Sequence, residues 1–468
     1  MKYLLLIPAL LVLLLLIALV RTLLMPNKRS DYAAPEADAR AMLLAQKLSK
    51  MIQYDTTSHA NVHEEEKFLG FHKVLEELFP LVHEKLERTV IDGNLLYYWK
   101  GKSSEKPILL MSHQDVVPAE GEWLHEPFSG DIADGKVWGR GASDTKCSVM
   151  AFFEAVEELL REGYTPECDV YLASSCTEEW AGDGAPKIVE ELKRRGVELF
   201  IVCDEGGGIK GNFAMVGVFE KGKADVKFTA RSTGGHASAP AKNTPIARLA
   251  AFVNEVETHT PFKRKFLPEV SAMFARLAPY APFGLKLVMG NLWLFAPIMK
   301  PVLGRISAQA GAMLQTTIAF TMQSGSDAYN VLPQEATLGA NMRFIPHQGE
   351  KESLEIIKAL AAKHGLETDI VHSNDYTEPV DINGEAFKLV EKVIGETFPG
   401  LPVSPYVMTG ATDAQFYQPI CPSCIRFAPV IYGPEQMKGM HGLNENIEYN
   451  CLPGAVSFYQ NLIKAQKR

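Results

Sequence analysis

The sequence of 468 residues contains no block of lysine and arginine long enough to follow a phosphate backbone. Its formal net charge is -9, so we expect no nucleic-acid partner. It also contains no internal repeat, and no low-complexity tract apart from the extreme N-terminus. A solenoid or another repeat architecture is therefore not expected.

Cysteine is scarce. There are seven cysteines, an odd number without a dense framework, so a disulfide scaffold is not expected. Several lie in apolar runs, which favours buried free thiols. Cys421 and Cys424 have the CxxC spacing of redox and zinc sites, but no second CxxC accompanies them. Their role and the redox compartment stay open.

Hydrophobic residues make up 47% of the chain and charged residues 22%, which is an ordinary globular composition with ample material for a core. The length predicts two or three domains.

The N-terminus is different, because Tyr3–Val20 is an uncharged run of 18 residues. As a helix it would measure roughly 27 Å, close to the hydrocarbon thickness of a bilayer. A cleaved signal peptide is the alternative, but its apolar region is usually ~7–15 residues and ends in a small-x-small site. A buried core helix is a third. We predict an uncleaved single-pass membrane anchor over residues 1–25. Basic residues on both sides leave the membrane face open.

After a polar linker over residues 26–37, apolar strands alternate with amphipathic helices up to residue 220. This alternation predicts an α/β fold with a mostly parallel sheet, as the first part of a large domain over residues 38–220. The expected strands are Leu95–Trp99, Ile108–Met111, Val170–Ser174 and Phe200–Val202. The expected helices are Asp38–Tyr54, Glu64–Phe79, Ser148–Arg161 and Ala185–Arg195.

The pattern changes over residues 221–376, which we interpret as a smaller α+β unit inserted into the first domain. The expected elements are strands Ala224–Arg231, Ala336–Phe344 and Leu366–His372 and helix Glu350–Lys363. Pro261–Gln323 is apolar and is expected to be mainly helical. Residues 377–468 return to α/β character as the second part of the large domain, with a last helix at Ala455–Gln466.

Histidine and carboxylates follow the predicted strands directly. His113 and Asp115 follow the second strand, Glu178 and Glu179 the third, and Asp204 the fourth, whereas Asp144 lies in a glycine-rich turn before a helix. In open α/β sheets ligands bind beyond the carboxyl ends of the strands. These side chains should therefore face one crevice.

The combination suggests a metal centre. Crowding Asp144, Glu178, Glu179 and Asp204 without a cation costs like-charge repulsion, which two divalent ions would relieve, and one carboxylate could bridge them. Imidazole and carboxylate groups are suitable ligands for zinc. On an extended strand His113 and Asp115 share one face, so Asp115 can accept the second imidazole N–H and fix the tautomer.

These segments resemble the metallopeptidase family of carboxypeptidase S, glutamate carboxypeptidase and aminoacylase, and are most similar to carboxypeptidase S and the N-fatty-acyl amino acid hydrolases. The resemblance covers about residues 40–468. It rests on Ser112–Asp115, Gly139–Lys146, Thr177–Glu179, Cys203–Glu205, Gly234–Ser238, Asn330–Pro333, Asn341–Arg343, Gly410–Asp413 and His441–Glu445, in the same order.

The resemblance implies two zinc ions, although other divalent ions would suit the same ligands. One ion would be held by His113 and Asp204 and the other by Glu179 and His441, with Asp144 bridging both. Glu178 would be the general base, and Asp115 would support catalysis beside the histidine. A cis peptide bond between Asp144 and Thr145 is also implied.

The resemblance also implies that the α/β domain is catalytic and that residues 221–376 form a lid domain of the dimerisation type. For substrate binding, it implies that His236 of this lid stabilises the oxyanion, often across a homodimer. Arg343, Asn330 and Gly410 would hold the carboxylate end of the substrate. Thr412 and Asp413 could serve only to shape their loop.

The expected function is therefore a di-metal hydrolase that cleaves the amide bond before a C-terminal amino acid. The substrates would be peptides or N-acyl amino acids with a hydrophobic acyl side. A dipeptidase or a short-chain aminoacylase is one alternative, and a non-catalytic membrane-tethered binding protein is another. The apolar stretch Phe283–Val302 either packs within the lid or a dimer interface, or lines a groove for an acyl chain.

Overall fold

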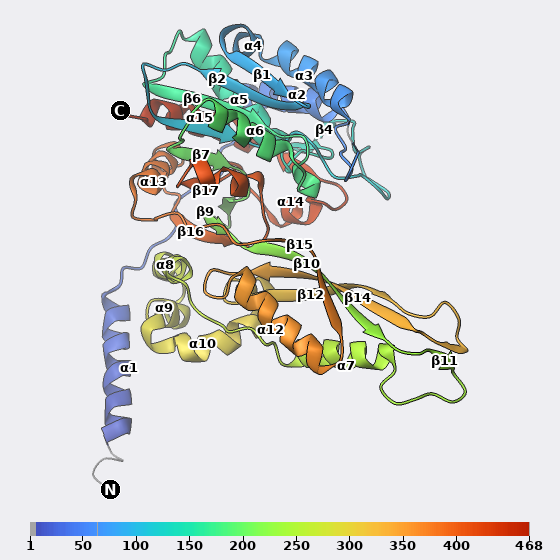
Figure 1. Cartoon of the computed structure of the whole chain (residues 1–468). Coiled ribbons are helices and arrows are strands. Elements are labelled where there is room, and N and C mark those ends of the chain that lie inside the picture. The colour runs from blue at the N-terminus through green and yellow to red at the C-terminus, as the bar shows by residue number, and fades with distance from the viewer. Residues whose placement is uncertain (1–5, 63, 468) are drawn as a thin grey trace. The chain divides into compact units, whose positions relative to one another are not determined.

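The computed structural model describes residues 6–62 and 64–467, which form two compact units (Figure 1). The large unit comprises Asn27–Val218, Pro379–Tyr406 and Thr412–Arg468. The small unit comprises Met1–Pro26, Phe219–Glu378 and Val407–Ala411.

A mixed sheet organises the large unit, with strand order β1-β2-β6-β3-β7-β17-β9-β16 and β8 paired to β9. The strands are β1 (Glu87–Ile91), β2 (Asn94–Trp99), β3 (Ser103–Met111), β6 (Cys168–Ser174), β7 (Ile201–Asp204), β8 (Gly208–Lys210), β9 (Phe213–Glu220), β16 (Val403–Met408) and β17 (Cys424–Arg426). The four expected strands are confirmed as β2, β3, β6 and β7.

The expectation of a mostly parallel sheet is wrong. Four pairs are parallel (β6–β3, β3–β7, β7–β17 and β9–β16), whereas β1–β2, β2–β6, β8–β9 and β9–β17 are antiparallel, so the sheet is mixed. The two-residue turn Asp92-Gly93 joins β1 to β2, and Gly211-Asn212 joins β8 to β9. All four of these turn residues have positive φ. A two-residue connection permits only an antiparallel hairpin.

Helices surround this sheet. They are α2 (Ala39–Ile52), α3 (Glu65–Leu78), α4 (Pro80–Lys85), α5 (Lys146–Arg161), α6 (Gly184–Arg194), α13 (Glu385–Thr397), α14 (Pro434–Gly439) and α15 (Leu452–Ala465), with 3-10 helices η2 (Glu178–Trp180), η4 (Asp413–Ile420) and η5 (Tyr449–Cys451). Helix α6 and η4 share one apolar core with β2, β3, β6 and β7. Helix α5 is buried over almost its whole length and packs against α15, α2 and α4. The buried α5 and the central strands fix the turn that precedes α5 and the loops that follow the strands.

A minor sheet of the large unit has the order β18-β5-β4. Its strands are β4 (Ile132–Ala133), β5 (Lys136–Trp138) and β18 (Asn446–Glu448). Pairing of β18 with β5 brings the chain after His441 next to the turn that carries Asp144. The peptide bond between Asp144 and Thr145 is cis, as the resemblance implied.

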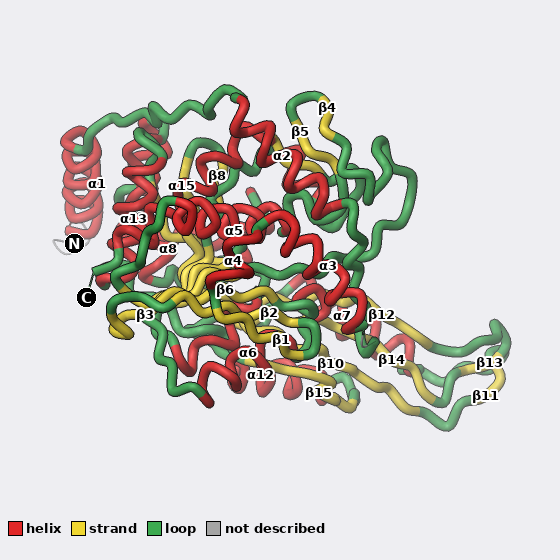
Figure 2. Tube along the Cα trace, turned by 90° about the horizontal axis from the view of Figure 1, so that it is seen from above, coloured by secondary structure: helices red, strands yellow, loops and turns green. Residues whose placement is uncertain are grey.

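The small unit contains an antiparallel sheet of order β12-β14-β10-β15 and a two-stranded ribbon β11–β13 at its tip (Figure 2). The strands are β10 (Gly222–Arg231), β11 (Gly235–His236), β12 (Thr317–Ser324), β13 (Val331–Leu332), β14 (Glu335–Phe344) and β15 (Glu367–Asn374). Helices α7 (Pro245–Thr258) and α12 (Glu350–Lys363) cover the core. Residues alternate between buried and less buried along β14, as the sequence pattern predicts.

The expectation of a mainly helical stretch over Pro261–Gln323 is confirmed. It contains α8 (Pro268–Leu277), η3 (Ala278–Tyr280), α9 (Phe283–Met289), α10 (Leu292–Ile306) and α11 (Ala308–Ala312). The stretch then ends in β12, which pairs with β14. Helix α1 (Leu6–Leu24) also belongs to the small unit. It is long and apolar enough over Ile7–Leu24 to cross a membrane, a property that signal sequences share.

Candidate metal centre

The carboxylate of Asp144 lies between two imidazoles in the large unit. Its Oδ1 is 3.2 Å from Nε2 of His113, and its Oδ2 is 3.2 Å from Nε2 of His441. His113 follows β3, Asp144 lies in the turn before α5, and His441 follows α14. Three segments from distant parts of the sequence therefore meet at one carboxylate, with one oxygen directed at each histidine.

Two further carboxylates enter from η2, directly after β6. Oε2 of Glu179 is 3.0 Å from Nε2 of His441, and its Oε1 accepts a hydrogen bond from the amide of Val117. Oε2 of Glu178 is 3.9 Å from Nε2 of His113. Adjacent glutamates thus reach the two different histidines.

Asp115 contacts both His113 and the backbone of the two glutamates in η2. Nδ1 of His113 is 2.9 Å from the main-chain oxygen of Asp115 and 3.3 Å from its Oδ1. The carboxylate of Asp115 also accepts hydrogen bonds from the amides of Glu178 and Glu179 and from the hydroxyl of Ser58. It therefore orients the imidazole, as expected, and fixes the start of η2 as well.

The strand β7 contributes two carboxylates. Asp204 lies at its end, and its oxygens accept hydrogen bonds from the amides of Glu205 and Ala414. Oε1 of Glu205 lies 3.3 Å from Nε2 of His113. The groups in the described residues that could hold an ion are His113 with Asp144 and Glu179, and His113 with Glu178 and Glu205. Glu205 was not among the residues expected from the sequence, although it directly follows Asp204, which was expected to bind a metal ion.

Glu445 fixes the turn that carries Asp144. Its Oε1 accepts hydrogen bonds from the amides of Ser143 and Asp144, both at 2.9 Å, and its Oε2 accepts from the amide of Gly141 and from Arg140. Both partners of this ion pair are almost fully buried. This contact between Glu445 and the turn of Arg140 was not expected from the sequence, although both residues lie in segments that carry the resemblance.

The electrostatics of the cluster follow from burial and close charges. Burial disfavours the charged form of His113, but its carboxylate neighbours, Glu205 first among them, raise its pKa well above the usual value. Hydrogen bonds to Asp144 and Glu179 raise the pKa of His441 to about 10. Burial acts to raise the pKa of Asp144, but its bonds to both histidines hold that pKa below the usual range.

The two glutamates of η2 show the opposite shift. Burial raises the pKa of Glu179 to about 7, although the hydrogen bond with His441 opposes the shift. Burial also raises the pKa of Glu178 well above its usual value; His113 opposes this shift and Glu205 adds to it. A carboxyl group with a raised pKa, poised at a crowded site, is suited to accept and return a proton.

The donor set fits a pair of divalent cations. Four carboxyl groups and two imidazoles converge, and the raised pKa values of Glu178 and Glu179 reflect burial together with this crowding of acidic groups, which bound cations would relieve. Nitrogen and carboxylate oxygen donors match zinc and related ions, and the two oxygens of Asp144 each face a different histidine.

The expected substrate-binding residues lie at two ends of the small unit. His236 and Asn330 are together at the tip, where the amide of Ala237 donates to the carbonyl of Asn330. Arg343 lies near the far end of β14, about 26 Å along the strand from Glu335 at a rise of about 3.3 Å per residue.

Gly410 lies with Arg343 rather than with His236. It follows β16, whose Met408 carbonyl accepts a hydrogen bond from the amide of Lys221, just before β10 begins. Lys223 of β10 pairs with Arg343. No atom lies within 4 Å of a Cβ built on Gly410, so the loop is open there.

The cysteines and Asp413 are also reactive or titratable groups, and all of them are buried. All seven cysteines are free and buried, which confirms that expectation, and a hydrogen bond from Cys424 lowers the pKa of Cys421. Asp413 accepts a hydrogen bond from Ser175, and burial raises its pKa to about 7.

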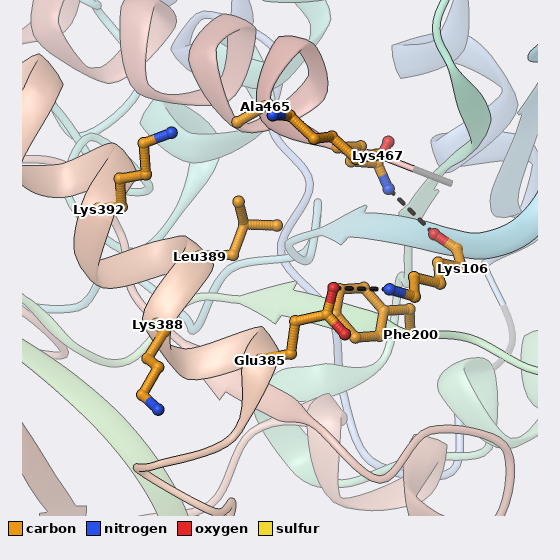
Figure 3. A pocket seen from close by; sticks show the side chains of 9 residues that line it. Lys106, Phe200, Glu385, Lys388, Leu389, Lys392, Ala465 and Lys467 are labelled. Carbon is orange, nitrogen blue, oxygen red and sulfur yellow. Dashed lines mark hydrogen bonds and ion pairs between the residues drawn. The ribbon is translucent and has the colours of Figure 1, made fainter.

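A cavity of about 310 Å³, lined by Lys106, Phe200, Glu385, Lys388 and Lys392 among others, opens on the large unit (Figure 3). Phe200 precedes β7 and Lys106 precedes the buried half of β3, so this cavity lies at the amino ends of those strands. The histidine–carboxylate cluster lies beyond their carboxyl ends, and the cavity is not part of it.

Comparison with known proteins agrees with this geometry. The sequence profile described as "Peptidase family M20/M25/M40" matches residues 109–465. "Probable carboxypeptidase S-like 2" of Dictyostelium discoideum is 32% identical, over 90% of this chain and 84% of its own. "N-fatty-acyl-amino acid synthase/hydrolase PM20D1" of Xenopus tropicalis is 33% identical, over 97% and 93%. The M20 family metallo-carboxypeptidase Sso-CP2 from Sulfolobus solfataricus shares the fold, with a TM-score of 0.68 and 18% identity over 92% and 99% of the chains.

Proposed function

Because this chain belongs to the peptidase family M20/M25/M40 and is a metal-dependent hydrolase, we propose that it cleaves the amide bond before a C-terminal amino acid. Its substrates would be peptides or N-acyl amino acids with a hydrophobic acyl side. The observation that carries the proposal is the Asp144 carboxylate, which directs one oxygen to His113 and the other to His441.

The family includes dinuclear metal-binding peptidases, and the cluster of this chain offers the donors for two ions. We assign His113 and Asp204 to one ion, Glu179 and His441 to the other, and Asp144 to both, with zinc as the native metal. Bound ions would polarise the scissile carbonyl and make water acidic enough to attack at neutral pH.

The protein's own groups then handle the proton. Glu178, with its raised pKa, takes the proton of the attacking water and returns it to the leaving nitrogen. Asp115 holds the amide of Glu178 and the imidazole of His113, so it keeps both in place during the reaction. His236 donates to the oxyanion that develops at the carbonyl.

Substrate recognition by this scheme needs a second copy of the chain. The fork of Arg343 suits the substrate carboxylate, and Gly410 leaves room beside it. His236 and Asn330 lie at the other end of the small unit, about 26 Å along the sheet, so one small unit does not bring both ends to one substrate. We therefore assign His236 and Asn330 to the active site of a partner copy in a homodimer.

The domains follow from these assignments. We assign residues 38–220 and 377–468 to the catalytic domain, residues 221–376 to the lid, residues 26–37 to the linker and residues 1–25 to an uncleaved membrane anchor. The length and composition of α1 support the anchor. The protein would then be a single-pass membrane protein.

A series of N-acyl amino acids on one amino acid tests the substrate class. With zinc-loaded full-length protein, kcat/KM should rise from acetyl to lauroyl by up to about fourfold per methylene, the equivalent of about 0.8 kcal/mol each. Glu178→Gln protein is the matched control for contaminating activity. A flat or falling series would favour a dipeptidase or short-chain aminoacylase, and no turnover with any amide would favour a binding protein.

A further inference from the structure

Helix α1 is joined to the apolar helices of the small unit by polar contacts that are shielded from water. The side-chain amide of Asn291, between α9 and α10, donates to the carbonyl of Ala18 at 3.3 Å and to the hydroxyl of Thr22 at 3.0 Å. Nζ of Lys286 donates to the carbonyl of Met25. Asn291 is fully buried, and so, almost completely, are Thr22 and Lys286.

These contacts place α9 close to the carboxyl end of α1 (Figure 1). At 1.5 Å per residue, Ala18 lies about 9 Å before Leu24 along the axis of α1. Gly290 lies against the end of the Met25 side chain, 2.5 Å from where a Cβ on Gly290 would be, which also brings the two segments together. If Ile7–Leu24 crosses a bilayer, the start of α10 lies within about 5–10 Å of the interface, the depth at which amphipathic helices bind.

The surface of α9 and α10 is suited to that environment. Large apolar side chains are exposed there: Phe283, Leu285, Trp293, Ile298 and Ile306. The two helices together are long and apolar enough for a span, but they bend by 102° at the break that contains Asn291. A bend of this size fits a hairpin that enters one leaflet better than a helix that crosses both.

The charge of the segment points to lipid rather than to another protein chain. Residues 270–326 contain no aspartate or glutamate, in a protein whose net charge is -9. Of the four basic residues there, Lys286 is buried against α1, whereas Lys300 and Arg305 on α10 are not buried. Basic side chains beside exposed apolar ones are the pattern of helices that bind the surface of anionic membranes.

We propose that α9 and α10 form a second membrane element, which enters the leaflet at the carboxyl end of α1 and is clamped to it by Asn291 and Lys286. The small unit would then sit on the bilayer and not merely be tethered to it. This inference rests on the proposed membrane insertion of α1. Removal of α1 as a signal peptide would expose Asn291 and Lys286, so the clamp also supports an uncleaved chain.

Site-directed spin labelling of the full-length protein in phosphatidylcholine–phosphatidylserine vesicles tests the proposal. Single cysteines replace Leu13 on α1, Ile298 on α10 and Val371 on β15, all exposed positions, while the native cysteines are buried. Collisions with a water-soluble nickel complex should be lost at Leu13→Cys and Ile298→Cys but kept at Val371→Cys. Collisions with oxygen, which concentrates in lipid, should rise at the first two positions.

The other outcomes separate the two ideas. If Leu13→Cys is in lipid but Ile298→Cys is as accessible to nickel as Val371→Cys, the inference fails and the anchor stands. If Ile298→Cys is shielded from both reagents, protein covers it, and the inference is again overturned. If Leu13→Cys itself stays in water, the anchor fails too. An unchanged thermal transition in each labelled variant shows that the fold is intact.

Discussion

The substitution Glu445→Gln should damage the metal centre without touching a metal ligand. An amide has one donor group, and both carboxylate oxygens of Glu445 accept hydrogen bonds: Oε1 from Ser143 and Asp144, and Oε2 from Gly141 and Arg140. In either orientation the new N–H₂ faces donors. Removing one partner of a buried ion pair costs about 3–5 kcal/mol. We expect a loss of that size from the free energy of unfolding of the large unit.

Urea unfolding of metal-free protein measures this loss, and Glu435→Gln is the matched control. Glu435 pairs with Lys136 at the surface, where such pairs contribute about 0–1 kcal/mol. Because Glu445 holds the amide of Asp144, zinc affinity should also fall by about 10–100-fold in Glu445→Gln, the effect typical of groups that orient ligands. If Glu445→Gln changes stability and zinc affinity no more than Glu435→Gln, the hydrogen bonds of Glu445 do not position Asp144.

Three further predictions concern the chemistry of the centre. Glu178→Gln should still bind zinc but lose at least ~100-fold in kcat, as steady-state kinetics would show, and a near-normal rate would assign the base to another group. Asp204→Asn should lose the ion beside His113 in a zinc titration whereas Glu205→Gln keeps it; the reverse result would make Glu205 the ligand. Because His441, with a pKa of about 10, is protonated at pH 7, zinc binding should release protons and weaken as the pH falls. Calorimetry in buffers of different ionisation enthalpy measures that release, and a buffer-independent enthalpy would contradict it.

Elements with a local pattern could be predicted from the sequence. Helix α12 was predicted with its bounds, and β14 was predicted from strict alternation. Strand β12 was missed because it follows a long apolar helical stretch and is held by pairing with β14, a contact that no local pattern reveals. The antiparallel pairs of the main sheet, such as β1–β2 and β8–β9, were missed because strand direction depends on short turns and distant partners.

The same distinction applies to the candidate site. The types of residue after β3, β6 and β7 indicated that His113 and the carboxylates would meet, because parallel strands end at one edge. The approach of His441 to Asp144 came only from the resemblance, since the two are far apart in the sequence. The clamp of Glu445 on Arg140 and the fixing of η2 by Asp115 depend on distances that spacing does not give.

The central claim is that Asp144 joins two metal ions in one hydrolytic centre. Crystals of the zinc-loaded protein, measured on both sides of the zinc absorption edge, test it most directly. We predict two anomalous peaks roughly 3.5–4 Å apart, one beside His113 and one beside His441, with Asp144 in contact with both. A single peak, or two peaks that do not share Asp144, would contradict the account.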